Sequence, residues 1–267
     1  MTIQPLPLTV CLIASNEAGR IRRALDSVAG WTSEIVVVLN EDVSDGTDRI
    51  AESYGAKVYR EPWKGFKGQK NSMTEKATQP WVLGLDADEE VSPELRDEII
   101  AVLSPSGGGT HQVAYSFPRC TFYCGRWIRH GDWYPDRKVL LWKRGEGHWG
   151  GVDPHAAIVV KGTVGRLRSD LRHYSMESIE HHVRKAVTYG NTFVQQKGLR
   201  MRRVGIFELG ARPAWRFIRS YFVRLGFLDG WQGYLVAYMV AFETFLRYAK
   251  VRELQQNESQ KQARAGS

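Results

Sequence analysis

Trp81-Val82-Leu83-Gly84-Leu85-Asp86-Ala87-Asp88 is an apolar run that ends in two carboxylates. Its first five residues have the continuous apolar character of a strand buried in a parallel sheet. Asp86 and Asp88 then lie at the carboxyl end of that strand, where open α/β sheets bind their ligands. Carboxylate oxygens suit Mg²⁺ or Mn²⁺, which proteins usually bind through one or two carboxylates together with the phosphates of a substrate. An acidic loop that caps the next helix has the same pattern, so the neighbouring segments must distinguish the two interpretations.

Strand and helix signals alternate before this run. Apolar strands are predicted at Leu8–Ala14, Glu34–Leu39 and Ala56–Tyr59. Between the first two strands, residues 21–28 carry apolar side chains at i, i+4 and i+7, which is typical of an amphipathic helix. The basic residues 64–71 are expected to form a glycine-interrupted loop that leads into a further helix. Such alternation predicts an α/β protein with a doubly wound, mostly parallel sheet.

The composition is that of an ordinary globular protein with one large domain, or one domain and an appendage. The chain has 267 residues, of which 43% are hydrophobic and 25% charged, and it is long enough to bury a substantial core. Its three cysteines form no disulfide framework, which fits a reducing cytoplasm. Cys120 and Cys124 are not followed by a second pair of ligands, so we expect ordinary thiols and not a zinc site. Residues 1–15 are predicted to form the first strand and not a signal peptide, because no basic segment precedes their apolar run.

The net charge of +8 comes from the C-terminal part of the chain. Residues 1–196 contain 24 basic and 24 acidic side chains, whereas residues 197–267 contain 13 and 5. Residues 212–225 predict an amphipathic helix, and Gly233–Leu246 is apolar but short and acidic at one position, so a membrane span is not expected. The polar residues 255–267 are expected to be disordered. The predicted helix has an arginine stripe (Arg212, Arg216, Arg219) and an apolar stripe (Trp215, Ile218, Phe222, Leu225).

The two stripes favour a helix that lies in a membrane interface, with its arginines at anionic head groups. Nucleic-acid binding would also explain the charge, but the positive residues flank apolar helices and no nucleic-acid motif is present. A third interpretation is that the apolar stripe packs against the body of the protein while the arginines form a solvated face.

Other polar groups are expected at the same edge as Asp86. Asn16 and Glu17 follow the first predicted strand, Asn40–Asp42 follow the second, and Lys67–Asn71 precede the helix before Trp81. Because parallel strands end at one edge of a sheet, these groups should surround one site. Acidic groups, a cation and lysines are what a nucleotide diphosphate requires. The chain has neither a P-loop nor a GxGxxG motif, so a P-loop NTPase or a Rossmann dehydrogenase is not indicated.

Taken together, several segments resemble the inverting family-2 glycosyltransferases, which have the GT-A fold. The resemblance covers about residues 8–250, and the combination of motifs is more specific than any one of them. The segments of the first half are Thr9–Glu17, Ile35–Val38, Ser44–Thr47, Gly65–Asn71 and Trp81–Glu89. Tyr134–Arg137, His173–Ser175 and Gly226–Gly230 resemble more narrowly the lipopolysaccharide-core glucosyltransferase branch.

This resemblance implies a nucleotide-sugar donor, UDP-linked, and a divalent metal, Mg²⁺ or Mn²⁺. Asp86 would contact the nucleoside, Asp88 would hold the metal, and Lys70 would lie near the uracil or the phosphates. Metal and lysine would then neutralise the charge that develops on the departing diphosphate. The implied donor-binding residues are Ala14, Asn16, Glu17, Asn40, Asp42, Lys67, Lys70, Asp86 and Ala87, and the implied metal ligands are Asp88 and Asp86.

Some of these positions carry alternatives. Relatives often have an aspartate where this chain has Asn40, although an amide can still form hydrogen bonds. Glu17 is either a ribose contact or a charge at a helix N-terminus, and Asn16 either a contact or a cap. Lys67 could equally be a solvated loop charge.

An inverting transfer also requires a general base that deprotonates the acceptor hydroxyl. Relatives of this branch tend to have a His-Glu pair after a Trp/Gly turn, whereas this chain has Ala156 in place of the glutamate. Asp153 is the first candidate, with His155 and Asp136 in reserve. Asp153 could instead be a turn residue before proline, and Asp136 could form only a salt bridge to a neighbouring cation.

The predicted organisation is a catalytic domain at residues 1–196, a basic membrane-associating region at 197–254 and the tail. Within the catalytic domain, residues 1–103 would bind the nucleotide sugar and residues 110–196 the acceptor. The predicted function is transfer of a hexose from a UDP-linked donor to a glycolipid such as lipopolysaccharide core, at the cytoplasmic face of the membrane. The alternatives are a nucleotidyltransferase of sugar metabolism and a catalytically degenerate nucleotide-sugar-binding protein. The predicted membrane-associating residues are Arg212, Trp215, Arg216, Arg219 and Phe222.

Overall fold

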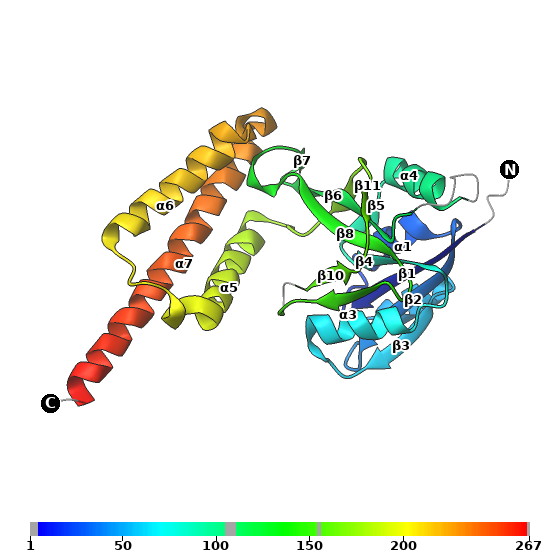
Figure 1. Ribbon diagram of the computed structural model, residues 1–267, viewed down its shortest axis with the longest axis horizontal. Helices are drawn as coiled ribbons and strands as arrows, with labels where there is room; N and C mark the ends of the chain where they lie inside the picture. Colours follow the sequence, from blue (N-terminus) through cyan, green and yellow to red (C-terminus); the bar gives the residue numbers. More distant parts are fainter. Residues whose placement is uncertain (1–4, 105–110, 154–155, 266–267) are drawn as a thin grey trace. The chain divides into compact units, whose positions relative to one another are not determined.

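The computed structural model describes residues 5–104, 111–153 and 156–265. They form two compact units, shown in Figure 1. The first contains residues 1–119 and 136–173, and the second contains residues 120–135 and 174–267. This division differs from the boundary expected at residue 196, because α5 (Ile179–Lys197) packs against α7 (Gly230–Ala265) of the second unit.

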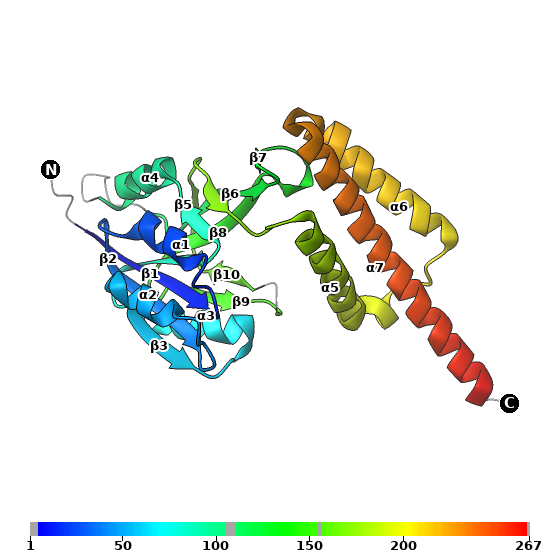
Figure 2. The same cartoon turned by 180° about the vertical axis from the view of Figure 1, so that it is seen from behind.

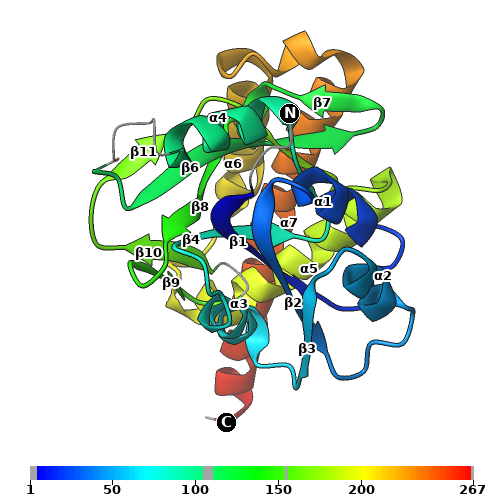
Figure 3. The ribbon, with the colours of Figure 1, turned by 90° about the vertical axis from the view of Figure 1, so that its right-hand side faces the viewer.

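A parallel sheet forms the centre of the first unit. The strand order is β3-β2-β1-β4, with β1 paired in parallel to both β2 and β4. Figure 3 shows α3 on one side of these strands and α1 and α2 on the other. The doubly wound, mostly parallel sheet that the sequence predicts is therefore confirmed. The elements are β1 (Leu6–Ala14), α1 (Ile21–Val28), β2 (Thr32–Asn40), α2 (Thr47–Ser53), β3 (Lys57–Glu61), α3 (Gly65–Glu75) and β4 (Trp81–Asp86).

Antiparallel strands continue the sheet beyond β4. β8 (Asp136–Lys143) pairs with β4, β6 (Ala114–Tyr123) pairs with β8, and β12 and β5 follow in that order. A separate two-stranded sheet joins β9 and β10. The other elements of this unit are β5 (Glu89–Val91), α4 (Pro93–Leu103), β9 (Gly147–Gly150), β10 (Ala157–Val160), β11 (Val164–Arg166) and β12 (Leu171–His173).

The hydrophobic core follows from the sequence pattern. The continuous apolar runs of β1, β2 and β4 are buried, as expected for the central strands of a parallel sheet. On α1, Ile21, Leu25 and Val28 are buried together with Ala24. The predicted helical stripe is thus confirmed, and α1 covers one face of the sheet (Figure 2).

Two local predictions need correction. The basic residues 64–71, expected to form a loop, are almost entirely helical, because α3 begins at Gly65. Gly65 adopts a φ of +77°, which a glycine accepts easily, and Asp153 accepts a hydrogen bond from the Lys67 amide in the first turn. The tail from residue 255 is also helical rather than disordered as far as Ala265, since it continues α7.

The second unit is mainly helical. α6 (Ile206–Ile218) continues into a π-helical turn (Arg219–Val223) and packs against α7. The core of this unit contains Tyr123, Ile128, Val236 and Val240. Within the described part of the chain, no helix is long and apolar enough to cross a membrane. The unit also contains β7 (Arg126–Ile128), short 3₁₀ turns at Gly131–Trp133, Gly198–Arg200 and Gly226–Asp229, and the C-terminal helix α7.

A buried carboxylate in β2 makes the fold of the first unit sensitive to acid. Glu34 accepts hydrogen bonds from the hydroxyl groups of Thr9 and Thr78 at 2.5 and 2.9 Å and from Lys57 at 2.7 Å. Burial favours the neutral acid, but these hydrogen bonds outweigh burial and lower the pKa of Glu34 from 4.5 to about 2. Since the pKa is lower in the folded state, the stabilisation is complete above pH 4.5 and is lost as the pH falls towards 2.

We therefore expect E34Q to lower the free energy of unfolding at pH 7 by about 2 kcal/mol, because a charged acceptor of several hydrogen bonds is lost. The variant should also show a weaker decrease in stability than the wild type as the pH falls from 4.5 to 2. Urea unfolding at a series of pH values measures both effects, with E52Q on the exposed face of α2 as the control. Equal pH dependence in E34Q and wild type would contradict this explanation.

Candidate active site

The candidate site lies at the carboxyl ends of β1 and β4. Ile13 of β1 pairs with Asp86, the last residue of β4. After β1, the chain adds β2 and β3 on one side of that strand and then returns to add β4 on its other side. The strand order therefore reverses between β1 and β4. Open α/β sheets bind ligands in the crevice outside the strand ends at such a reversal. The structure thus places Ala14, Asp86 and Ala87 where the sequence predicted a ligand site.

A lysine of α3 forms an ion pair with the first aspartate. Lys70 Nζ lies 2.7 Å from Asp86 Oδ1 and 4.5 Å from the centre of the Trp149 ring. Asn71 fixes the position of Trp149 through hydrogen bonds to its backbone N–H and C=O, at 2.8 and 2.9 Å. Gly84 leaves room for this indole, since an added Cβ would lie 3.0 Å from the Trp149 ring. Lys70 is therefore held in place at the strand ends before any ligand binds.

Asp88 lies in the turn between β4 and β5. Its Oδ2 is 3.5 Å from Nε2 of His173, which ends β12. Burial raises the pKa of Glu17, Arg20 opposes that rise, and the negative charges of Asp88 and Asp45 add to it. The negative charge of Asp88 thus opposes the ionisation of Glu17, and a cation beside Asp88 would reduce that effect.

The donor set around Asp88 fits a hard divalent cation. A carboxylate oxygen and an imidazole nitrogen are suitable ligands for Mn²⁺, and Asp88 remains partly exposed. Among the residues that the structure describes, no group of three or more histidine, cysteine or acidic side chains is arranged to hold a metal.

A second acidic network adjoins the same turn. Glu89, which is almost fully buried, accepts a hydrogen bond from the Asp86 amide and forms an ion pair with Arg119 at 3.1 Å. Arg119 also binds Asp136, its direct neighbour across the β6–β8 pairing, at 2.8 Å. Burial opposes the ionisation of Asp136, but Arg119 and Lys138 outweigh burial and lower its pKa. Asp136 is thus a carboxylate at neutral pH.

The loops after β1 and β2 are joined by side-chain hydrogen bonds. Asn16 Oδ1 accepts from the Ser44 amide at 3.1 Å, and the Glu17 amide donates to Thr47 Oγ1 at 2.9 Å. The structure thus joins Asn16 and Glu17 to residues 44–47, just beyond the predicted Asn40–Asp42. Asn40 ends β2 and is half-buried, whereas the side chain of Asp42 is exposed.

Asp153 has a structural partner in α3. Its Oδ1 accepts a hydrogen bond from the Lys67 amide at 2.8 Å, and a Cβ added to Gly65 would lie 2.3 Å from its Oδ2. Asp153 thereby satisfies an amide in the first turn of the helix that carries Lys70. The side chain of Lys67 is exposed. His155, the other candidate base, lies outside the described residues.

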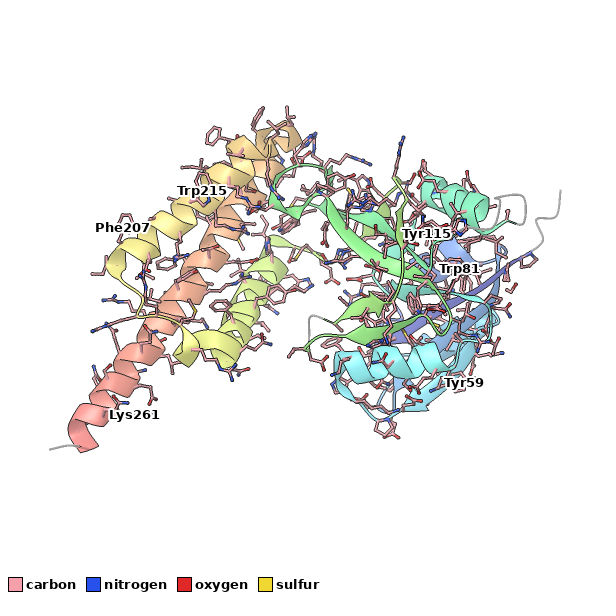
Figure 4. The ribbon with its side chains drawn as sticks, viewed as in Figure 1. Tyr59, Trp81, Tyr115, Phe207, Trp215 and Lys261 are labelled. Atoms are coloured by element: carbon pink, nitrogen blue, oxygen red, sulfur yellow. The ribbon has the colours of Figure 1, made fainter. Side chains whose placement is uncertain are left out.

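The predicted membrane-associating residues of the second unit have different surroundings, some paired and some exposed. Arg216 and Arg219 lie 3.1 and 3.4 Å from Asp132, a buried carboxylate, and Arg212 lies over the ring of Tyr248. Trp215, 57% exposed, and Phe207, 83% exposed, lie on the outer side of α6 (Figure 4). Arg216 and Arg219 thus pair with Asp132 while about a third of each side chain stays exposed, and the interpretation of the two stripes stays a prediction.

Sequence reasoning missed the roles of three residues. Arg119 has no motif around it in the sequence, and Glu89 and His173 stand out only as members of longer segments. Their contacts join β5, β6 and β12, which are far apart along the chain. The acidic residues after β4 indicate that a basic partner is needed, but they do not identify Arg119 as that partner.

Comparisons with known proteins identify the family and the fold. A family model described as glycosyl transferase family 2 matches residues 9–210. A glycosyltransferase of Rickettsia typhi, itself uncharacterised, is 32% identical over 256 residues, which cover 92% of this chain and 87% of that protein. The lipopolysaccharide core biosynthesis glycosyltransferase LpsC of Rhizobium meliloti is 27% identical over 261 residues, which cover 92% and 95% of the two chains.

Among solved structures, a mannosyltransferase from Pyrobaculum calidifontis in complex with GDP-Man and Mn²⁺ shares the fold. Its TM-score is 0.50 at 15% sequence identity, with 95% of this chain and 89% of that chain covered. The sheet and its helical extension therefore have the GT-A fold, and the family model places the protein among the glycosyltransferases. The chain belongs to glycosyltransferase family 2, as its sequence predicted.

Proposed function

We propose that this enzyme transfers a hexose from a UDP-linked donor to a glycolipid, such as lipopolysaccharide core, with inversion at the transferred carbon. The observation that carries the proposal is the Lys70–Asp86 ion pair beside Asp88, at the point where the strand order reverses. A nucleoside diphosphate would find there a fixed ammonium group and two carboxylates. The similarity to LpsC of Rhizobium meliloti supports the class of acceptor.

Each residue of the site would bind a different part of the donor. Asp86 would accept hydrogen bonds from the nucleoside, and Asp88 with His173 would hold Mg²⁺ or Mn²⁺. A bound divalent cation would neutralise negative charge on the departing diphosphate. Lys70 would add a positive charge that Asp86 and Trp149 already hold in position, so little reorganisation is required during the reaction.

We favour Asp136 as the general base. The antiparallel pairing of Leu83 with Leu141 brings the start of β8 to the end of the sheet where β4 ends. Asp136 is the first residue of β8, is ionised, and keeps about a third of its side chain exposed to an acceptor. Asp153 is instead engaged with the first turn of α3, which suggests a structural role for it.

We also propose that the second unit attaches the enzyme to the cytoplasmic face of an anionic membrane, where a glycolipid acceptor would reside. Soluble proteins rarely expose many large apolar side chains in one region. Here the exposed set covers α6, the turn after it and the start of α7, and Arg212 of α6, whose side chain is 49% exposed, would meet anionic head groups. The set contains Trp215, Ile218, Phe222, Val223, Leu225, Phe227, Leu228 and Trp231.

We expect the double variant W215E/F222E to bind vesicles of mixed anionic and neutral phospholipids at least about tenfold more weakly than the wild type, because two aromatic groups can no longer enter the interface. Co-sedimentation with the vesicles measures the effect. I179E, which changes an exposed apolar residue of α5, is the matched control. Unchanged vesicle binding by the double variant, with its fold verified by circular dichroism, would contradict membrane attachment through this surface.

A screen of nucleotide sugars for thermal stabilisation tests the donor assignment. Binding to the folded state raises the melting temperature by mass action. We expect a UDP-hexose with Mn²⁺ to stabilise the wild type and to have no effect on D88A. A nucleotidyltransferase would instead be stabilised by a nucleoside triphosphate and release pyrophosphate, and a degenerate binding protein would bind the donor without transferring its sugar.

A further inference from the structure

Arg119 connects the acidic turn after β4 with Asp136. Its Nη1 donates to Glu89 Oε1 at 3.1 Å, while Nε and Nη2 both donate to Asp136 Oδ2, at 3.1 and 2.8 Å. Glu89 uses its other oxygen, Oε2, to accept from the Asp86 amide at 2.9 Å. A continuous series of polar contacts therefore runs from the backbone of Asp86 to the carboxylate of Asp136.

Stability alone explains this network poorly. Glu89 is 1% exposed and Arg119 is largely buried, so both lose most of their hydration on folding. Burial and the neighbouring Asp86 raise the pKa of Glu89, and Arg119 and His173 oppose that rise. Buried ion pairs of this kind are often no more stabilising than apolar residues of similar volume. The network thus buries an arginine, at a cost in lost hydration, between the Asp86–Asp88 turn and Asp136.

We propose that Arg119 is a positioning residue for glycosyl transfer, which holds Asp136 at a set distance from the Asp86–Asp88 turn. This inference rests on the proposed function, in which Asp86 binds the donor and Asp136 is the base. Arg119 also lowers the pKa of Asp136, together with Lys138 and against the effect of burial. One guanidinium group would thus set both the position and the charge of the base.

The geometry requires an arginine. Its planar fork reaches Asp136 with two nitrogens and Glu89 with the third, an arrangement that a lysine ammonium on a flexible stem cannot reproduce. R119K would keep the positive charge but lose the fixed geometry, whereas R119M would lose both. The two variants therefore separate the effect of position from that of charge.

Steady-state kinetics of sugar transfer from a UDP-hexose, measured as a function of pH, tests this role. We expect kcat to fall about a hundredfold in R119K, because a small displacement of a reacting group has effects of that size, and further in R119M. The donor KM should remain within about threefold of the wild-type value, since Asp88 and Lys70 are unchanged. The acid limb of kcat should move to higher pH in R119M, because Asp136 loses the cation that lowers its pKa.

The matched control is R172K, which changes a neighbouring ion pair of the same kind, between Arg172 and Glu90 at 2.6 Å. It should retain kcat within about threefold and leave the pH profile unmoved. If R119K and R119M fold and transfer sugar like the wild type while D136N is inactive, the positioning role is overturned but the proposed function stands. If D136N is as active as the wild type, Asp136 is not the general base, and the positioning role of Arg119 is overturned with that assignment. Should R119M fail to fold, R119K still tests the position of Asp136, and E89Q, which weakens the second anchor of Arg119 and keeps its charge, tests that position independently by a fall in kcat.

Discussion

D88N is expected to reduce sugar transfer by about three orders of magnitude, the largest effect among the donor-site variants. The substitution keeps the size of the side chain and removes the negative charge that would hold Mg²⁺ or Mn²⁺ beside His173. A divalent cation and preorganised charges provide several kilocalories per mole of stabilisation to a departing diphosphate. Initial rates at saturating UDP-hexose and Mn²⁺ measure the loss, and thermal shift measures the accompanying loss of donor binding.

D97N is the matched control for this prediction. Asp97 is an exposed aspartate on α4 that forms an ion pair with Arg96 at 2.9 Å, away from the acidic turn. Its variant should retain the wild-type rate and the wild-type response to Mn²⁺. A D88N enzyme that keeps at least a third of the wild-type rate would contradict the assignment of Asp88 as the metal ligand.

D136N is expected to reduce kcat by about a hundredfold to ten-thousandfold, which is the usual contribution of a positioned general base. Donor binding should persist, because Lys70, Asp86 and Asp88 are untouched. Rapid-quench or steady-state assays give kcat, and thermal stabilisation by UDP-hexose with Mn²⁺ reports binding. The variant should therefore bind the donor and transfer its sugar very slowly.

D153N distinguishes the two candidate bases. The amide oxygen of asparagine can still accept from the Lys67 amide, so stability should fall by no more than about 1 kcal/mol, as for a weakened helix cap. Transfer should remain within about tenfold of the wild type. The opposite ranking, with D153N inactive and D136N active, would assign the base to Asp153 and remove Asp136 from the mechanism.

The fold was predictable where local patterns and global topology agree. Continuous apolar runs such as Leu8–Ala14 and Trp81–Leu85 are expected in central parallel strands, and the structure buries them. The start of α3 is not predictable from local pattern, because two glycines within residues 64–71 favour a loop. A partner 86 residues away, Asp153, supplies the acceptor that its first turn needs, and no local signal reveals that contact.

The candidate site was predictable in part. Strand ends meet at one edge of a sheet, so the approach of Lys70 to Asp86 followed from sequence order once the strands were recognised. The connection from Glu89 through Arg119 to Asp136 did not, because it depends on how the antiparallel strands pair. The orientation of α6 was equally inaccessible, since only the fold reveals that Asp132 is buried beside its arginines.

Incubation of the purified enzyme with Mn²⁺, a panel of nucleotide sugars and a glycolipid extract tests the proposed reaction. Nucleotide release is followed by chromatography and the lipid products by mass spectrometry. The proposed function predicts that one UDP-hexose releases UDP in equal amount to a glycolipid that has gained one hexose, and that D88N forms neither product. Release of pyrophosphate from a nucleoside triphosphate, or donor binding without a glycosylated product for any sugar nucleotide, would contradict it.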